Sequence, residues 1–128
     1  MPLIKIYNLH PSEERSSLLQ TLGNQLVQAA LDAKVPGLVD PNKVHVNLAG
    51  SRIIPSGEKP PVFIEVYIHD KPTREYKHFL DLADKLAEEA YKVVHELHSS
   101  VEVIVDAVNI GRCDSLRVVG IFPQPKDN

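Results

Sequence analysis

The chain has 128 residues, of which 43% are hydrophobic and 24% charged, and its formal net charge is −3. This composition is typical of one folded domain with its own core, so we expect a single domain over residues 1–128. The only cysteine, Cys113, excludes an intrachain disulfide and a multi-thiolate zinc site, and the weakly acidic balance does not favour nucleic acid.

The first half of the chain, residues 2–50, predicts the order strand, helix, strand. Residues 2–9 (PLIKIYNL) alternate between apolar and polar positions, which is typical of a strand. Ser12 can cap a helix over residues 12–34. The apolar stripe of this helix is Leu18, Leu22, Leu26 and Ala30. Residues 43–50 (KVHVNLAG) alternate again and predict the second strand.

The second half, residues 62–108, repeats that order. VFIEVYI (62–68) is the strongest strand pattern, and Pro72 and Thr73 are expected to begin a helix that runs to about Leu97. Its apolar stripe is Phe79, Ala83, Leu86, Ala90, Val94 and Leu97. VEVIVDAV (101–108) predicts the fourth strand. In the tail, residues 113–128, only RVVGIF (117–122) has a strand pattern, and it predicts at most a short fifth strand.

We therefore expect an α+β fold of order β-α-β-β-α-β, with a four-stranded mixed sheet covered on one face by two helices. The other face carries charged and apolar side chains together. Its residues are Leu3, Lys5, Tyr7, His45, Asn47, Phe63, Glu65, Tyr67, Glu102 and Asp106. Such a face is too apolar for open water and too charged for a dry core, which favours a subunit interface or a shared, partly hydrated barrel.

Pro2 is the best candidate for chemistry. Proline at position two normally permits removal of the initiator methionine, which would leave a secondary amine at the chain end. An α-amino group has a pKa of about 8 in water, and burial lowers that value. A neutral amine held at the start of a strand can act as a general base or as a nucleophile toward carbonyls. The alternative is that Pro2 is only a permissive residue near the terminus.

The opening Met-Pro-Leu-Ile-Lys-Ile, followed by a helix and the β-α-β-β-α-β order, resembles the tautomerase superfamily. The length is similar to its double-length members, such as 5-carboxymethyl-2-hydroxymuconate isomerase and macrophage migration inhibitory factor. The resemblance implies a homotrimer with sheets inside and helices outside. It also implies a cofactor-free keto–enol tautomerase or isomerase, in which Pro2 is the general base on a small carbonyl or enol acid.

The chain departs from the family at its arginines. Short members carry an arginine near the position of Ser12 and another where this chain has His45. The decarboxylases carry Arg-Pro-Arg after the third strand, where this chain reads His69-Asp70-Lys71-Pro72. Only the proline is therefore carried over. A decarboxylase mechanism is not, although decarboxylase and hydratase activities stay open.

Four other residues are candidates for binding a substrate carboxylate or carbonyl. Arg52 follows the second strand and offers a planar fork of donors, or is only a solvated loop arginine. His45 could bind substrate or serve an interface. Lys5 could line the site or the subunit contact. Asn109 follows the fourth strand, where double-length members often complete the pocket.

Metal, cofactor and membrane are not expected. His95-Glu96-Leu97-His98 is one residue shorter than the zinc motif HExxH, and no glycine pattern predicts a nucleotide site. No long apolar run or secretory pattern is recognised, so we expect a cytoplasmic protein. The alternative to an enzyme is a non-catalytic trimer, or a ferredoxin-like protein that binds metabolites or partners.

Overall fold

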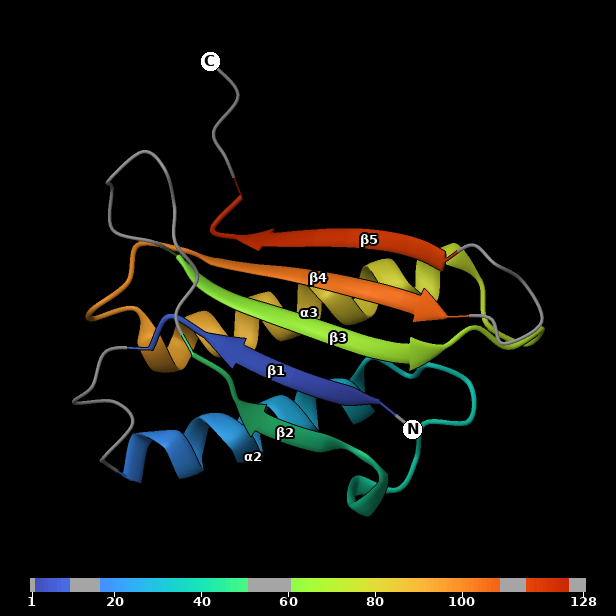
Figure 1. Ribbon diagram of the computed structural model, residues 1–128, viewed down its shortest axis with the longest axis horizontal. Helices are drawn as coiled ribbons and strands as arrows, with labels where there is room; N and C mark the ends of the chain where they lie inside the picture. Colours follow the sequence, from blue (N-terminus) through green and yellow to red (C-terminus); the bar gives the residue numbers. More distant parts are fainter. Residues whose placement is uncertain (1, 10–16, 51–60, 109–114, 125–128) are drawn as a thin grey trace.

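The computed structural model describes residues 2–9, 17–50, 61–108 and 115–124 (Figure 1). Their elements are β1 (Leu3–Tyr7), α2 (Ser17–Asp32), the short 3-10 helix η1 (Pro41–Lys43), β2 (His45–Leu48), β3 (Val62–His69), α3 (Tyr76–Val94), β4 (Val101–Val108) and β5 (Ser115–Phe122). The expected α+β class and element order are thereby confirmed. The sequence-based cap at Ser12 lies outside the described residues.

All five strands form one mixed sheet in the order β2-β1-β3-β4-β5. The strands that each helix connects are direct neighbours and parallel, since β1 pairs with β2 and β3 pairs with β4. The two β-α-β halves join through the antiparallel pair β1 and β3, with Leu3 opposite Tyr67 and Tyr7 opposite Phe63. The start of β1 therefore lies beside the C-terminal end of β3.

This strand order excludes the ferredoxin-like alternative. In the split β-α-β units of that fold, another strand separates the two strands that a helix connects. Here β2 lies directly against β1, and β4 lies directly against β3. The element order is the same in both folds, so the sequence pattern could not separate them.

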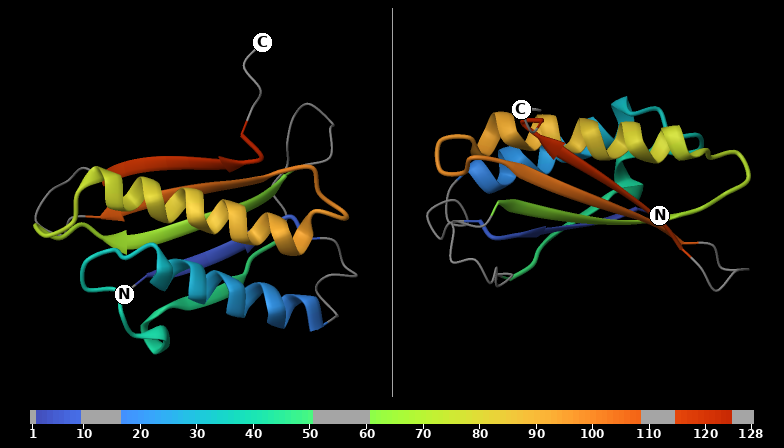
Figure 2. Two further views of the ribbon diagram at one scale, coloured as in Figure 1. Left: turned by 180° about the vertical axis from the view of Figure 1, so that it is seen from behind. Right: turned by 90° about the horizontal axis from the view of Figure 1, so that it is seen from above.

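Both helices cover the same face of the sheet, as the view from above shows (Figure 2). The core lies between them and the sheet because the strand residues facing the helices are aliphatic. These buried strand residues are Ile4, Ile6, Val62, Ile64, Val66, Ile68, Val101, Val103, Val105, Ala107 and Val118. Gln25 of α2 also donates a 3.0 Å hydrogen bond to Glu89 of α3, which ties the two helices together.

The sheet has five strands rather than the four expected, because β5 is a full strand of eight residues. It pairs antiparallel with all of β4, from Ser115 opposite Val108 to Phe122 opposite Val101. Gly120 interrupts the apolar pattern of this segment, which made it look short in the sequence. In the structure that glycine is required, because β5 passes close to the backbone of α3.

Helix α3 begins later and ends earlier than predicted. Pro72 and Thr73 lie in a turn, which the Arg74 N–H closes with a 2.8 Å hydrogen bond to the Lys71 carbonyl. The helix then begins after Glu75, whose N–H donates to His78 Nδ1 at 2.8 Å. At the other end, Leu97 lies beyond the last helical residue and is 46% exposed, so it is not part of the buried stripe.

Candidate functional site

Pro2 lies buried at the entry to β1, at one end of the sheet. Its carbonyl accepts a 3.1 Å hydrogen bond from the His45 N–H, which continues the parallel pairing of β1 with β2 by one residue. Side chains alternate along a strand, so Pro2 is on the same face as Ile4 and Ile6, toward the helices. Pro2 is therefore buried, and its backbone is held by the first hydrogen bond between β1 and β2.

Arg74 is a buried cation at the same end of the sheet, and the sequence analysis did not single it out. The residue as a whole is only 7% exposed. Nε donates to the Pro36 carbonyl at 2.8 Å, and Nη1 donates to the His69 carbonyl at 2.7 Å. Gly37, whose φ of +84° favours glycine, forms the turn that follows Pro36.

The charge of Arg74 is held in a partly desolvated place. Burial lowers the pKa of the guanidinium, and the nearby carboxylate of Asp70 acts in the opposite direction. Arginine stays protonated even so, because its ordinary pKa is above 12. The loop between α2 and η1 and the end of β3 are thus held together by a permanent positive charge.

The predicted site residues fall into different places. His45 is adjacent to Pro2 through the backbone, and its side chain is exposed. Lys5 lies on the opposite face of the sheet from the Pro2 ring, with Nζ 5.5 Å from the centre of the Tyr67 ring. Arg52 and Asn109 lie outside the described residues. Within the described part of the chain, no group of three or more His, Cys, Asp or Glu could hold a metal ion.

The face of the sheet away from the helices carries two polar pairs, and we call it the open face. Its members include Leu3, Lys5, Tyr7, Phe63, Glu65, Tyr67, Ile104, Asp106, Arg117, Val119 and Ile121. Tyr67 donates its hydroxyl hydrogen to Glu65. Arg117 Nε donates to Asp106 at 2.9 Å across the neighbouring strands. Asp106 is itself 7% exposed, so this ion pair is anchored in the sheet.

The hydrogen bond to Glu65 should be visible in the titration of Tyr67. This bond, followed by burial, raises the pKa of Tyr67 to about 12. Because the pKa of Tyr67 is higher in the folded protein, its protonated hydroxyl stabilises the fold at pH values below the unfolded pKa near 10. This contribution to the free energy of unfolding disappears as the pH rises through the folded-state pKa. We expect Glu65→Gln to lower the Tyr67 pKa, measured by tyrosinate absorbance. Identical titrations of the two proteins would contradict the bond.

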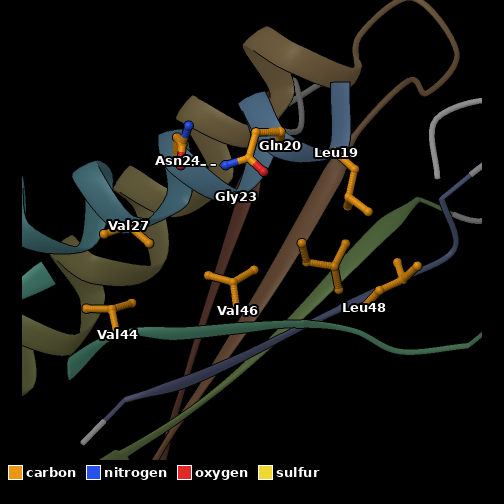
Figure 3. Close-up of a pocket in the computed structure, with 9 residues that line it drawn as sticks. Leu19, Gln20, Gly23, Asn24, Val27, Val44, Val46 and Leu48 are labelled. Atoms are coloured by element: carbon orange, nitrogen blue, oxygen red, sulfur yellow. Dashed lines mark hydrogen bonds between the residues drawn. The ribbon is translucent and has the colours of Figure 1, made fainter. Parts of the chain in front are cut away.

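An apolar groove lies elsewhere, between α2 and the edge strand β2 (Figure 3). It has a volume of about 460 Å³ and is lined by Ile6, Leu19, Gln20, Gly23, Asn24, Val27, Val44, Val46 and Leu48. A second hollow of about 620 Å³ lies between the end of α2 and the first part of α3. Pro2 lines neither of these two, and the groove has no charged side chain that could hold a carboxylate.

The described helices contain no segment that is both long and apolar enough to cross a membrane.

The fold is similar to the folds of several solved structures. A fused 4-OT structure has a TM-score of 0.65 and 15% identity, and the match covers 84% of this chain and 87% of that one. A fused 4-OT described as an asymmetric trimer has a TM-score of 0.60 and 18% identity, covering 84% and 85%. Malonate semialdehyde decarboxylase has a TM-score of 0.53 and 13% identity, covering 85% and 83%.

These likenesses concern the fold. No family model matches the chain, and no curated protein matches it by sequence. The resemblance drawn from the sequence is confirmed at the level of architecture, because neighbours of this kind include fused 4-OT proteins and a decarboxylase with hydratase activity. The roles of individual residues are matters for proposal and test.

Proposed function

We propose that the chain is a cofactor-free tautomerase or isomerase in which the amine of Pro2 is the general base. The observation that carries the proposal is the burial of Pro2 at the start of β1, with its carbonyl fixed by the His45 N–H. An amine in that place is poorly solvated, which disfavours its charged form. The likeness of the fold to fused 4-OT proteins supports the same reading.

In the proposed reaction, neutral Pro2 takes a proton from an enol or from the carbon beside a carbonyl. The same amine then returns a proton to another atom of the substrate, so no redox partner is needed. A cation holds the substrate carboxylate. Arg52, His45, Lys5 and Asn109 remain the proposed substrate-binding residues. Of these, His45 is the one that the described contacts bring next to Pro2.

The experiment that tests the function begins with the intact mass of the purified chain. We expect the mass of a chain that lacks Met1, because only then is the Pro2 nitrogen a free amine. The processed protein should convert phenylenolpyruvate from enol to keto without added metal or cofactor. A retained Met1 would remove the amine and with it the proposed mechanism.

We also propose that the protein is a cytoplasmic homotrimer with the open face of the sheet turned inward. Apolar side chains on this face are left uncovered, such as Val119, which is 45% exposed, and Val108, which is 40% exposed. Apolar area of this kind is usually buried against a partner. A similar fold forms a trimer in a fused 4-OT protein. Subunit packing would also supply walls around the Pro2 end of the sheet.

Val119→Glu is expected to break this assembly, because it would bury a carboxylate among apolar side chains without a partner. Light scattering after size-exclusion chromatography should show the mass falling from three chains to one. Val39→Glu is the matched control, since Val39 is 82% exposed and lies in the connection between α2 and η1, away from the open face. A Val119→Glu protein that keeps the wild-type mass would contradict the arrangement.

The alternative function is a trimer that binds a small acid without catalysis. Loss of Met1 is compatible with both functions, so the assay with phenylenolpyruvate distinguishes them. A processed chain with no activity on phenylenolpyruvate and tight binding of a carboxylate ligand would favour it.

A further inference from the structure

The backbone of β1 alternates between its two neighbouring strands. The Pro2 carbonyl and the Ile6 carbonyl accept hydrogen bonds on the β2 side, from the N–H groups of His45 and Ala49. The backbone groups of the alternate residues Leu3, Lys5 and Tyr7 therefore point toward β3, beginning with Leu3 opposite Tyr67. His69 comes two residues after Tyr67, so it lies just beyond this last pair, at the end of the sheet where Pro2 enters β1.

The His69 carbonyl is directed toward that position. On the other side of β3, the Asp70 N–H donates to the Val108 carbonyl of β4 at 2.8 Å. Because successive residues of a strand point their backbone groups to opposite sides, the polar groups of His69 point toward β1. The hydrogen-bond donor found on this carbonyl is Arg74 Nη1, at 2.7 Å.

We propose that Arg74 is a positioning residue for the Pro2 amine, because its guanidinium is bonded to the carbonyl of His69 that faces β1 at the Pro2 end of the sheet. This inference rests on the proposed function, because it concerns the amine that methionine removal creates. The His69 carbonyl thus holds the guanidinium at the end of the sheet that carries the Pro2 nitrogen. The second bond of Arg74, to the Pro36 carbonyl, keeps the side chain from moving away.

Two consequences follow for the amine, and both favour its neutral form. The His69 carbonyl already accepts a hydrogen bond from Arg74, so it is a poor acceptor for an N–H of the protonated Pro2 amine. A hydrogen bond to that charged form would have raised the pKa of the amine. The fixed positive charge of Arg74 also repels a second positive charge. Arg74 thus acts on the base without touching the substrate.

Other titratable groups face this end of the sheet. From β2 there is His45, from β3 there are Tyr67 and His69, and after β3 there is Asp70. Lys5 lies three residues further along β1, on the open face beside Tyr67. Asp70 is the one whose charge opposes the effect, because it attracts the guanidinium and would favour the ammonium.

The test is the pKa of the Pro2 amine, followed by NMR of protein labelled with 15N-proline. Arg74→Gln keeps hydrogen-bond donors but removes the charge, and we expect the amine pKa to rise by about one pH unit. Arg74→Lys keeps the charge, and the pKa should move by only a few tenths. Lys77→Gln is the control, because it removes an exposed charge whose side chain is 71% accessible. It should leave the amine pKa unchanged.

The outcomes separate this inference from the proposed function. The amine could have the same pKa in the wild type and in Arg74→Gln, or an equally raised pKa in Arg74→Gln and Arg74→Lys. Either result would show that Arg74 does not act through its charge, and the Pro2 mechanism would stand. If Met1 is retained, both fall. Should Arg74→Gln not fold, Asp70→Asn decides, because it leaves both Arg74 bonds in place. It should lower the amine pKa by a few tenths, and an unchanged value would overturn the inference.

Discussion

Replacing Pro2 by alanine should reduce kcat/KM on phenylenolpyruvate by about 10²-fold to 10⁴-fold, the range that a positioned general base contributes. Alanine at position two also permits methionine removal, so the variant keeps a terminal amine. That amine is primary and is no longer fixed by a ring, whereas proline locks its own backbone torsion. The loss therefore measures the placement of the base rather than the presence of an amine.

Pro41→Ala serves as the control for this substitution. Pro41 is exposed and begins η1, away from the described contacts of Pro2. Its replacement should leave kcat/KM unchanged, and intact mass should show that all three proteins lack Met1. Equal rates for the wild type and Pro2→Ala would move the assignment to a binding or structural role.

Gly120→Ala should have the largest effect on stability. A Cβ at this position would lie 2.7 Å from the Ala83 carbonyl carbon and 2.9 Å from the Asp84 nitrogen. Both are backbone atoms of α3, so the clash cannot be relieved by rotating a side chain. Overpacking of this kind costs about 1–3 kcal/mol, and we expect the upper part of that range in the free energy of unfolding. Urea denaturation followed by circular dichroism measures it.

The same change at Gly23 should act in the opposite direction. Gly23 lies within α2, and a Cβ built there meets no atom within 4 Å. Alanine in the interior of a helix is better than glycine by about 0.5–1 kcal/mol, so Gly23→Ala should be stabilised. If Gly120→Ala were as stable as the wild type, the close packing of β5 on α3 would be wrong.

The sequence was sufficient for the elements that have clear periodicity. The alternation in 62–68 and 101–108 corresponds to β3 and β4, and the stripe at Phe79, Ala83 and Leu86 is buried in α3. These patterns are strong because one face of each element is buried and the other is not. The strand pattern of β5 is weaker. One of its helix-facing positions is Gly120, which has no side chain because the backbone of α3 lies too close.

The site was harder to predict because its parts come from distant segments. Pro2 could be singled out, since its chemistry depends on its own amine. Arg74 could not, because its two hydrogen bonds are to the carbonyls of Pro36 and His69, which come together only in the folded chain. The only signal in the sequence is an arginine shortly after the end of a strand pattern, two residues beyond Pro72.

The orientation of Lys5 illustrates a similar limit. Alternation places Lys5 on the face opposite Ile4, and the structure has it there, above the Tyr67 ring. Which neighbour it meets depends on the register of β1 against β3, and a shift of one residue would reverse the faces. The sequence fixes no such register by itself, because the connection between the two halves is long.

The proposal that the Pro2 amine is the catalytic base is tested most directly by comparing two pH dependences measured on one protein. One is the titration of the amine by 15N NMR, and the other is the pH profile of kcat/KM, which reports the essential base of the free enzyme. We expect the acid limb of the profile to have the same pKa as the amine, below the ordinary value near 8. A limb at a different pKa, or full activity in a chain that keeps Met1, would contradict it.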